Sequence, residues 1–244
     1  MQLMLATDDA GGPELFASVQ GEGPSAGRPV AFIRLSRCNL ACVWCDTAYT
    51  WRFEGDERPH RSDTAYDRRA NQVGLDAEEA ARRILALGQD RLVVTGGEPT
   101  LQTPALVRLL EALPRTSVEI ETNGTSLPSP ALDARIDQYN VSPKLSHSGN
   151  PANLALREEA LRFYAECGRA FFKFVVATPG DVAEALDVVE RFGLAKDRTF
   201  LMPEGTDGAT LRARQEWLVP LCLKHGLRLT DRLHIHLFGD TRGT

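Results

Sequence analysis

Residues 30–47 read VAFIRLSRCNLACVWCDT and combine a strand-like run with three closely spaced cysteines. The first part of this stretch, Val30 to Leu35, is rich in apolar and β-branched residues and predicts a strand. The chain then enters a loop that carries Cys38, Cys42 and Cys45 in the spacing C-x3-C-x2-C. Reactive residues directly after a strand are typical of α/β barrels, whose active sites lie at the carboxyl ends of the strands. The stretch therefore predicts an α/β protein with a metal centre at the end of a strand.

The spacing of the three cysteines leaves two kinds of metal centre open. A cubane iron–sulfur cluster bound by three thiolates keeps one iron free for another ligand. A zinc site needs a fourth protein ligand, for which Asp46, His60 or a distant histidine is available. Zinc patterns favour two C-x2-C units, and the loop has one, so the spacing favours the cluster. The other cysteines, Cys167 and Cys222, fall in predicted helices and are expected to be structural.

Strand-like and helix-like segments alternate along most of the chain, which predicts βα units and a parallel sheet. Strands are expected over residues 30–35, 91–94, 117–120, 138–141, 170–176 and 199–202. Helices are expected over residues 76–87, 103–113, 157–167, 181–192 and 210–225, the first with Asp76 as its N-cap. These units predict an incomplete barrel or an open sheet in one domain, residues 1–244. The charged segment 52–71 is expected to be a surface insertion.

Composition and charge exclude several classes of protein. The chain has 43% hydrophobic and 25% charged residues, as ordinary globular proteins do. A net charge of -5 gives no positive field for a phosphate backbone, so no direct nucleic-acid partner is expected. No apolar run approaches the roughly 18 residues of a membrane span, and the N-terminus shows no basic leader. A cytoplasmic protein without a membrane partner is therefore expected, and the odd number of cysteines, five, fits metal binding in a reducing compartment better than disulfides.

Two segments resemble the radical S-adenosylmethionine (radical SAM) superfamily. The loop from Cys38 to Cys45, with Trp44 before the last cysteine, is similar to the superfamily's signature. The segment Thr95-Gly96-Gly97-Glu98-Pro99 is similar to its Gly-Gly-Glu-Pro element, where glycines allow the backbone to approach a ligand. The resemblance implies a 4Fe–4S cluster on the three cysteines, with S-adenosyl-L-methionine (SAM) on the open iron. It also implies the fold class, a partial (β/α)6 TIM-like barrel of the radical SAM type.

Further segments narrow the resemblance. Five segments, in this order along the chain, resemble those of the 7-carboxy-7-deazaguanine synthases: residues 18–23 (SVQGEG), 45–47 (CDT), 121–125 (ETNGT), 141–144 (VSPK) and 234–244 (HIHLFGDTRGT). The resemblance extends from about Phe16 to the C-terminus. It implies a lyase of queuosine and 7-deazapurine biosynthesis, a pathway of tRNA modification, that converts 6-carboxy-5,6,7,8-tetrahydropterin to 7-carboxy-7-deazaguanine with loss of ammonia. It further implies Mg²⁺, a homodimer, and an electron donor such as flavodoxin or ferredoxin.

The resemblance also implies which residues form the site. Contacts to SAM are expected from Trp44, Cys45, Asp46, Gly97, Ser142, Pro143, Lys144, Met202, Pro203 and Glu204. Contacts to the pterin are expected from Val19, Gln20, Gly21, Arg34, Thr95, His236 and Thr244. Thr47 is expected to bind Mg²⁺ through its hydroxyl, and Glu121 to support the site by hydrogen bonding.

Chemistry agrees with two of these expectations and leaves a third open. The guanidinium of Arg34 suits the substrate carboxylate, since it can bind both oxygens. Mg²⁺ tolerates few protein ligands, because it retains waters and binds substrate oxygens. His236 is expected on a strand with His234, both side chains on one face, so a metal pair is an alternative to substrate contact.

Two other functions remain open at this point. One is an enzyme that activates a glycyl-radical partner, which shares a similar length and cysteine spacing but would need a peptide-binding groove. The other is a zinc-stabilised binding module without catalysis. A brown anaerobic preparation with about four irons per chain would exclude the module, whereas colourless protein with one tight zinc would support it.

Overall fold

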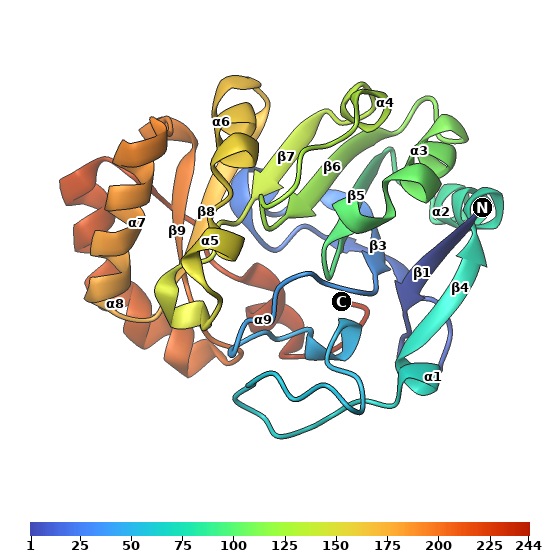
Figure 1. The fold of residues 1–244 in the computed structure, drawn as a ribbon, viewed down its shortest axis with the longest axis horizontal. Helices are drawn as coiled ribbons and strands as arrows, with labels where there is room; N and C mark the ends of the chain where they lie inside the picture. Colours follow the sequence, from blue (N-terminus) through green and yellow to red (C-terminus); the bar gives the residue numbers. More distant parts are fainter.

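Six parallel strands form the wall of an incomplete barrel in the computed structural model, which describes residues 1–244 (Figure 1). They lie side by side in chain order: β3 (Pro29–Leu35), β5 (Arg91–Gly96), β6 (Ser117–Thr122), β7 (Gln138–Val141), β8 (Ala170–Val176) and β9 (Thr199–Pro203). All neighbouring pairs in this series are parallel. The six predicted strands are confirmed, because no boundary differs from the expected one by more than two residues.

Helices return the chain to the same end of the sheet after each strand, which makes the parallel order possible. They are α2 (Ala77–Ala86), α3 (Thr103–Glu111), α4 (Pro130–Asp133), α5 (Ala152–Ala155), α6 (Glu158–Glu166), α7 (Pro179–Phe192) and α8 (Gly208–His225). Asp76 is the N-cap of α2, as expected, and its side chain accepts a hydrogen bond from the Glu78 amide at 2.9 Å. The chain is a partial (β/α)6 TIM-like barrel, and no helix is both long and apolar enough to cross a membrane.

Further short elements surround the barrel. β1 (Gln2–Ala6) lies between β3 and β4 (Gln72–Asp76) and is antiparallel to both, while β2 (Leu15–Val19) is antiparallel to β3. β10 (Arg228–Leu229) extends the parallel series beyond β9. The remaining elements are α1 (Arg68–Asn71), α9 (Leu233–Phe238), η1 (Gly23–Ser25), η2 (Ala48–Thr50), η3 (Pro99–Gln102), η4 (Ser146–Ser148) and η5 (Lys196–Arg198). Segment 52–71 follows η2 as an irregular loop that ends in α1, and most of its residues are exposed.

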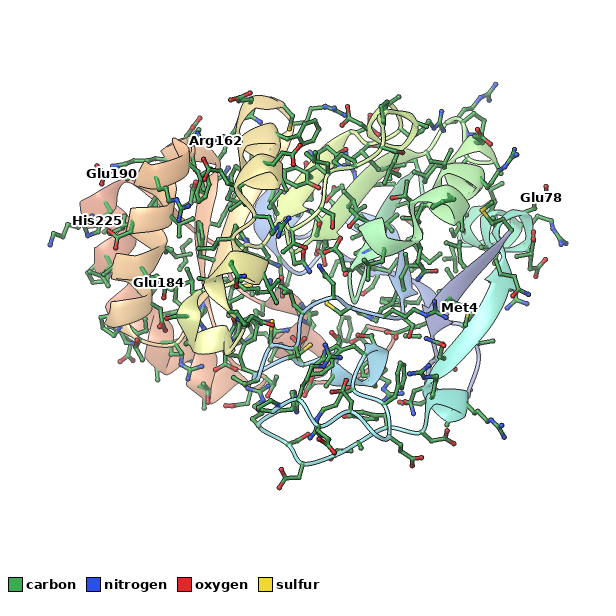
Figure 2. The ribbon with its side chains drawn as sticks, in the orientation of Figure 1. Met4, Glu78, Arg162, Glu184, Glu190 and His225 are labelled. Atoms are coloured by element: carbon green, nitrogen blue, oxygen red, sulfur yellow. The ribbon has the colours of Figure 1, made fainter.

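The two faces of the barrel sheet differ in chemistry, because successive strand residues point to opposite faces. In β6, Val118 and Ile120 belong to the hydrophobic core under the helices. Charged side chains on the outer helices, such as Arg162 of α6 and Glu190 of α7, point away from this core (Figure 2). The alternate strand positions face the barrel interior and carry polar residues: Arg34, Thr95, Glu119, Glu121, Asn140 and Lys173. The barrel therefore has an apolar outer layer and a polar interior, and the polar interior forms the site.

The C-terminal segment differs from the expectation. Residues 233–238 form the short helix α9, so the expected strand with His234 and His236 on one face is wrong. Residues two apart point to the same side of a strand but to nearly opposite sides of a helix. The two histidines therefore have different surroundings, as described below.

Candidate active site

A cavity of about 410 Å³ opens at the carboxyl ends of the barrel strands. Its lining comes from the turn after β2, the cysteine loop, the ends of the barrel strands, α9 and the last residues of the chain. Active sites of α/β barrels lie at this end, since the loops that follow the strands converge there. The C-terminus also lies near the middle of the molecule beside this opening (Figure 1).

The three cysteines of the loop all line this cavity. Asn150 holds the middle of the loop, since its Oδ1 accepts from the Ala41 amide at 2.9 Å and its Nδ2 lies 3.3 Å from Cys42 Sγ. The Nδ2 of Asn123 lies 3.9 Å from Cys38 Sγ. N–H groups aimed at two of the sulfurs favour the thiolate over the thiol.

The donor set of the loop fits an iron–sulfur cluster. Burial raises the pKa of Cys38 to about 12 and that of Cys45 to about 11, so in the bare protein both are neutral thiols at pH 7. Binding to iron supplies the positive charge that buried thiolates need. No three cysteine, histidine or carboxylate side chains of the chain converge closely enough to hold a single metal ion. Cys167 and Cys222 lie outside the cavity lining, so Cys38, Cys42 and Cys45 would hold such a cluster and would leave one iron without a cysteine ligand.

His60, one of the residues available to complete a zinc site, contacts the cysteine loop from segment 52–71. Its Nε2 lies 2.8 Å from the carbonyl oxygen of Cys45, and its Nδ1 lies 3.2 Å from the amide of Ser62. Since a carbonyl oxygen can only accept, Nε2 donates to Cys45. The Arg61 amide adds a second bond, to the Val43 carbonyl at 2.7 Å. The segment expected to be a surface insertion thus fixes the backbone of the cysteine loop.

The Gly-Gly-Glu-Pro element lies directly against the start of the cysteine loop. A Cβ atom at Gly96 would overlap the carbonyl oxygen of Leu35, and one at Gly97 would overlap that of Arg37. Gly96 also has a φ of +124°, which favours glycine. The glycines were expected to let a ligand approach the backbone; the close neighbour in the structure is the protein's own backbone, where β3 leads into Cys38.

Glu98 of the same element ties the ends of β5 and β6 together. It is fully buried, and its Oε1 accepts from the hydroxyls of Thr100 at 2.7 Å and Thr122 at 2.9 Å. Its Oε2 accepts from the Asn123 amide at 2.7 Å. Because the side chain of Asn123 reaches Cys38, Glu98 supports the cluster site through one intermediate residue.

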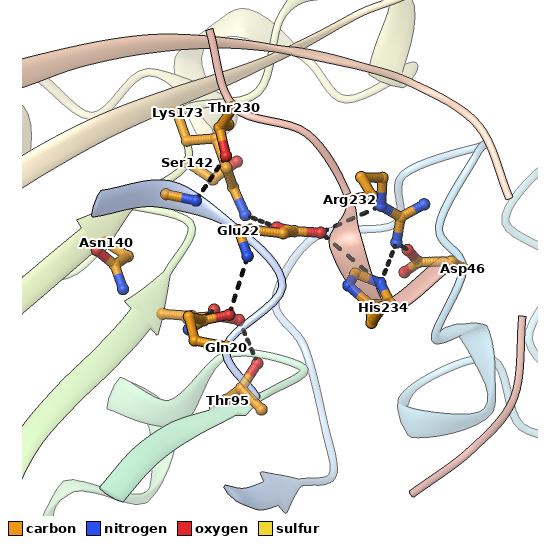
Figure 3. A network of polar contacts seen from close by, with 12 residues as sticks. Gln20, Glu22, Asp46, Thr95, Asn140, Ser142, Lys173, Thr230, Arg232 and His234 are labelled. Atoms are coloured by element: carbon orange, nitrogen blue, oxygen red, sulfur yellow. Dashed lines mark hydrogen bonds and ion pairs between the residues drawn. The ribbon is translucent and has the colours of Figure 1, made fainter. Parts of the chain in front are cut away.

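A charged network crosses the cavity from the turn after β2 to α9 (Figure 3). Glu22 lies at its centre, paired with Lys173 of β8 and, at 3.1 Å, with Nε of Arg232. Arg232 also pairs with Asp46, next to Cys45, and donates to the Gly205 carbonyl. Burial alone would raise the pKa of Glu22, but Lys173 and Arg232 outweigh it and hold the pKa below its ordinary range. The network thus joins the cysteine loop to three other parts of the cavity wall.

A second, smaller network lies deeper in the barrel and involves Glu121 of β6. Its Oε1 accepts from Nε2 of Gln20 at 3.2 Å, and its Oε2 accepts from the Thr95 hydroxyl at 2.7 Å (Figure 3). Glu121 therefore holds two residues of the expected pterin site in fixed positions.

The cavity brings together most of the residues that the sequence assigned to the site. In the lining are the expected residues Val19, Gln20, Gly21, Arg34, Cys38, Cys42, Trp44, Cys45, Asp46, Thr47, Thr95, Gly97, Glu121, Ser142, Lys144, Met202, Glu204 and Thr244. Pro143, Pro203 and His236 do not line it. His236 pairs instead with Asp231, with 3.1 Å between Nε2 and Oδ2, while His234 faces the cavity and packs on Gly21.

Several residues of the site were given no role from the sequence: Glu22, Asn123, Asn150, Lys173 and Arg232, while His234 was considered only as half of a metal pair. One of them had a usable signal. Lys173 interrupts the apolar strand AFFKFVV, and a charged residue in such a strand is seldom buried without a partner. Glu22 and Asn123 belong to segments that carry the resemblance, but they, Asn150 and Arg232 lie outside the regular strands and helices, where no pattern of the sequence indicates which way a side chain points.

Comparison with known proteins agrees with this geometry. A family model described as Radical SAM superfamily matches residues 32–213. The chain is 39% identical over 235 residues to the 7-carboxy-7-deazaguanine synthase of Pyrobaculum aerophilum, covering 94% of this chain and 95% of that protein. It is 34% identical over 229 residues to that of Hyperthermus butylicus, covering 91% and 90%. The crystal structure of QueE from Escherichia coli superposes with a TM-score of 0.66 at 25% identity, covering 96% of this chain and 95% of that chain. The chain therefore belongs to the radical SAM superfamily, in the family of the 7-carboxy-7-deazaguanine synthases.

Proposed function

We propose that this protein converts 6-carboxy-5,6,7,8-tetrahydropterin to 7-carboxy-7-deazaguanine with loss of ammonia. The observation that carries the proposal is one cavity, lined both by the three cysteines of the loop and by a guanidinium, that of Arg34, suited to a carboxylated small molecule. The names of the relatives support the same reaction. The family membership contradicts a non-catalytic zinc module, and these relatives argue against an activator of glycyl-radical enzymes.

Cys38, Cys42 and Cys45 would hold a 4Fe–4S cluster with SAM at its open iron, and these two cofactors supply the radical chemistry when bound. The protein's own task is to bind, orient and shield the reactants. Seven residues that line the cavity around the cysteine loop are proposed contacts of SAM: Trp44, Asp46, Gly97, Ser142, Lys144, Met202 and Glu204. Pro143 and Pro203 adjoin these residues in the chain and are proposed to shape the backbone rather than to touch the ligand.

The polar interior of the barrel is the proposed pterin site. The Nε of Arg34 is engaged by Glu14 at 2.7 Å, while its Nη atoms make no hydrogen bond to the protein. The Nη edge is therefore available for the substrate carboxylate, which a guanidinium binds through two parallel hydrogen bonds. Val19, Gln20, Gly21, Thr95 and Thr244 line the same space. We assign to His234 the contact that the sequence assigned to His236, since His234 faces the cavity.

Four finer assignments complete the proposal. Thr47 lines the cavity next to Cys45, and we propose that its hydroxyl binds a Mg²⁺ that is shared with the substrate carboxylate. An electron donor such as flavodoxin or ferredoxin is proposed to reduce the cluster. The protein is proposed to act as a homodimer and, since none of its five cysteines is in a disulfide, in the reducing cytoplasm.

The test is turnover by anaerobically reconstituted protein. Reactions contain the pterin, SAM, dithionite and Mg²⁺, and mass spectrometry measures the deazaguanine product. Product is expected with the full mixture and is expected to be absent when SAM or dithionite is omitted. A preparation that contains the cluster and cleaves SAM but leaves the pterin unchanged would overturn the proposed substrate.

A further inference from the structure

A buried carboxylate outside the cavity wall connects two parts of the proposed pterin site. Glu14 precedes β2 and is fully buried. Its side chain accepts hydrogen bonds from three separate segments: Nε of Arg34 at 2.7 Å, the hydroxyl of Tyr49 at 3.0 Å, and the amide of Gly243 at 3.3 Å. Buried carboxylates are retained where such partners compensate for lost water. Nothing in the proposed reaction itself uses Glu14, which has no access to the cavity.

The first of these bonds sets the direction of the Arg34 side chain. A guanidinium is planar, so fixing Nε fixes the plane and the direction in which the Nη edge points. The main chain adds a second hydrogen bond between the same two residues, because the Arg34 amide donates to the Glu14 carbonyl oxygen at 3.1 Å. Arg34 lines the cavity with only 17% of its side chain exposed. Glu14 thus holds the guanidinium at its Nε atom and leaves the Nη edge free to face the substrate space.

The third bond holds the C-terminal tail, residues 239–244. Five of these six residues line the cavity, so the tail forms part of its wall. Arg242 lies over the ring of Tyr49, with 3.7 Å between Cζ and the ring centroid, and Tyr49 donates to Glu14. The tail contains two glycines at positive φ, Gly239 at 72° and Gly243 at 73°, which let the chain turn back toward Glu14. The tail is therefore anchored to the same carboxylate as Arg34.

We propose that Glu14 is a positioning residue that holds both the guanidinium of Arg34 and the C-terminal tail against the pterin space, so that carboxylate recognition and closure of the cavity depend on one buried group. The proposal rests on the proposed function, since it takes Arg34 as the partner of the substrate carboxylate. Glu14 touches neither substrate nor cofactor and acts through Arg34 and Gly243.

The test compares Glu14→Gln and Glu14→Ala with the parent protein. Glutamine keeps the shape of the side chain and loses its charge, which weakens the hydrogen bonds from Arg34 and Gly243, whereas alanine removes these bonds. Two tetrahydropterins serve as probes, one with and one without the 6-carboxylate, the second as a competitive inhibitor. For Glu14→Gln we expect the KM of the carboxylated pterin to rise about tenfold with a smaller change in kcat. The inhibition constant of the uncarboxylated pterin is expected to stay within about twofold, since that compound has no group for Arg34.

Hydrogen exchange of the tail provides a readout that is independent of turnover. In cluster-free protein, the Gly243 amide should exchange at least about tenfold faster in Glu14→Gln than in the parent, and faster again in Glu14→Ala. Asp9→Asn is the matched control, because it removes an exposed contact to Arg242 at 3.9 Å and leaves Glu14 intact. It is expected to change neither readout.

The outcomes separate this proposal from the proposed function. Equal weakening of both pterins would show that Glu14 supports the fold in general and would overturn its role in carboxylate recognition. Unchanged exchange at Gly243 would overturn its role in holding the tail. If the parent protein bound neither pterin, the proposed function would fail together with the Arg34 part, and faster tail exchange in Glu14→Gln would still support the contact between Glu14 and the tail.

Discussion

Replacing Arg232 by methionine should destabilise the protein strongly, because Arg232 connects two carboxylates inside the cavity. Its side chain is 8% exposed and pairs with Glu22 and Asp46, whose side chains are 13% and 31% exposed. Breaking a buried ion pair by removing one partner costs about 3 to 5 kcal/mol. Two features reduce this value, since Glu22 keeps Lys173 as a partner and Asp46 reaches water. We therefore expect a loss of about 2 to 3 kcal/mol in the free energy of unfolding, or about 5 to 10 °C in Tm.

The assay is urea unfolding of anaerobically purified protein, followed by circular dichroism, with Arg191→Met as the matched control. Arg191 pairs with Glu158 at 3.6 Å, and both side chains are more than half exposed, so the control should lose less than about 1 kcal/mol. If Arg232→Met lost no more stability than Arg191→Met, the charged network would not hold the cavity together and the reasoning would be refuted.

Acid should weaken the ion pairs of the same charged network. Because the pKa of Glu22 lies below its ordinary value of 4.5 in the folded protein, its contribution to stability is complete above that value and is lost as the pH falls toward the folded pKa. The parent protein should therefore lose stability below about pH 4.5, and Arg232→Met should show a shallower loss over the same range. Parallel pH profiles for the two proteins would contradict the assignment of Arg232 as a partner of Glu22.

Three further predictions concern the cluster loop and the metal. His60→Ala removes the bond to the Cys45 carbonyl and should lower the iron content after reconstitution and speed bleaching in air; unchanged content and bleaching would limit His60 to a surface role. Gly97→Ala should prevent cluster binding, since its Cβ would overlap the Arg37 backbone, while Gly180→Ala, where the nearest side-chain atom is 3.5 Å away, should bind the cluster normally; absorbance of the reconstituted proteins decides. Thr47→Ala should weaken the response of turnover to Mg²⁺ with the cluster spectrum intact, and an unaltered Mg²⁺ titration would overturn the role of Thr47.

The barrel could be predicted from the sequence because its strands are encoded locally. The strands of residues 138–141 and 170–176 have the expected boundaries, since both are short runs of β-forming residues bounded by breaks in the pattern. β1, β2 and β4 were missed because each lies outside the βα repeats and depends on antiparallel pairing with another segment. Such pairing is set by tertiary packing rather than by local preference.

The site residues, like the strands, could be predicted only where the signal is local in the sequence. The three cysteines are close in the sequence, so their spacing alone indicated a shared centre. Arg232 and Asp46 are 186 residues apart, and their contact depends on how α9 packs across the cavity. The placement of His234 and His236 failed for a related reason: an alternating sequence such as HIHLF fits a strand, and the last helical turn forms only because the rest of the barrel positions it.

The most direct test of the proposed reaction follows hydrogen from C6 of the pterin, because the resemblance to this family implies that the radical derived from SAM takes this hydrogen before SAM is re-formed. Anaerobic protein with cluster is incubated with SAM, dithionite, Mg²⁺ and a pterin that carries deuterium at C6, and SAM is recovered for mass spectrometry. Deuterium in the recovered SAM, together with the deazaguanine product, is the result predicted if the cysteine loop and the polar interior of the barrel hold the two reactants side by side. Product without deuterium in SAM, or cleavage of SAM with the pterin unchanged, would contradict it.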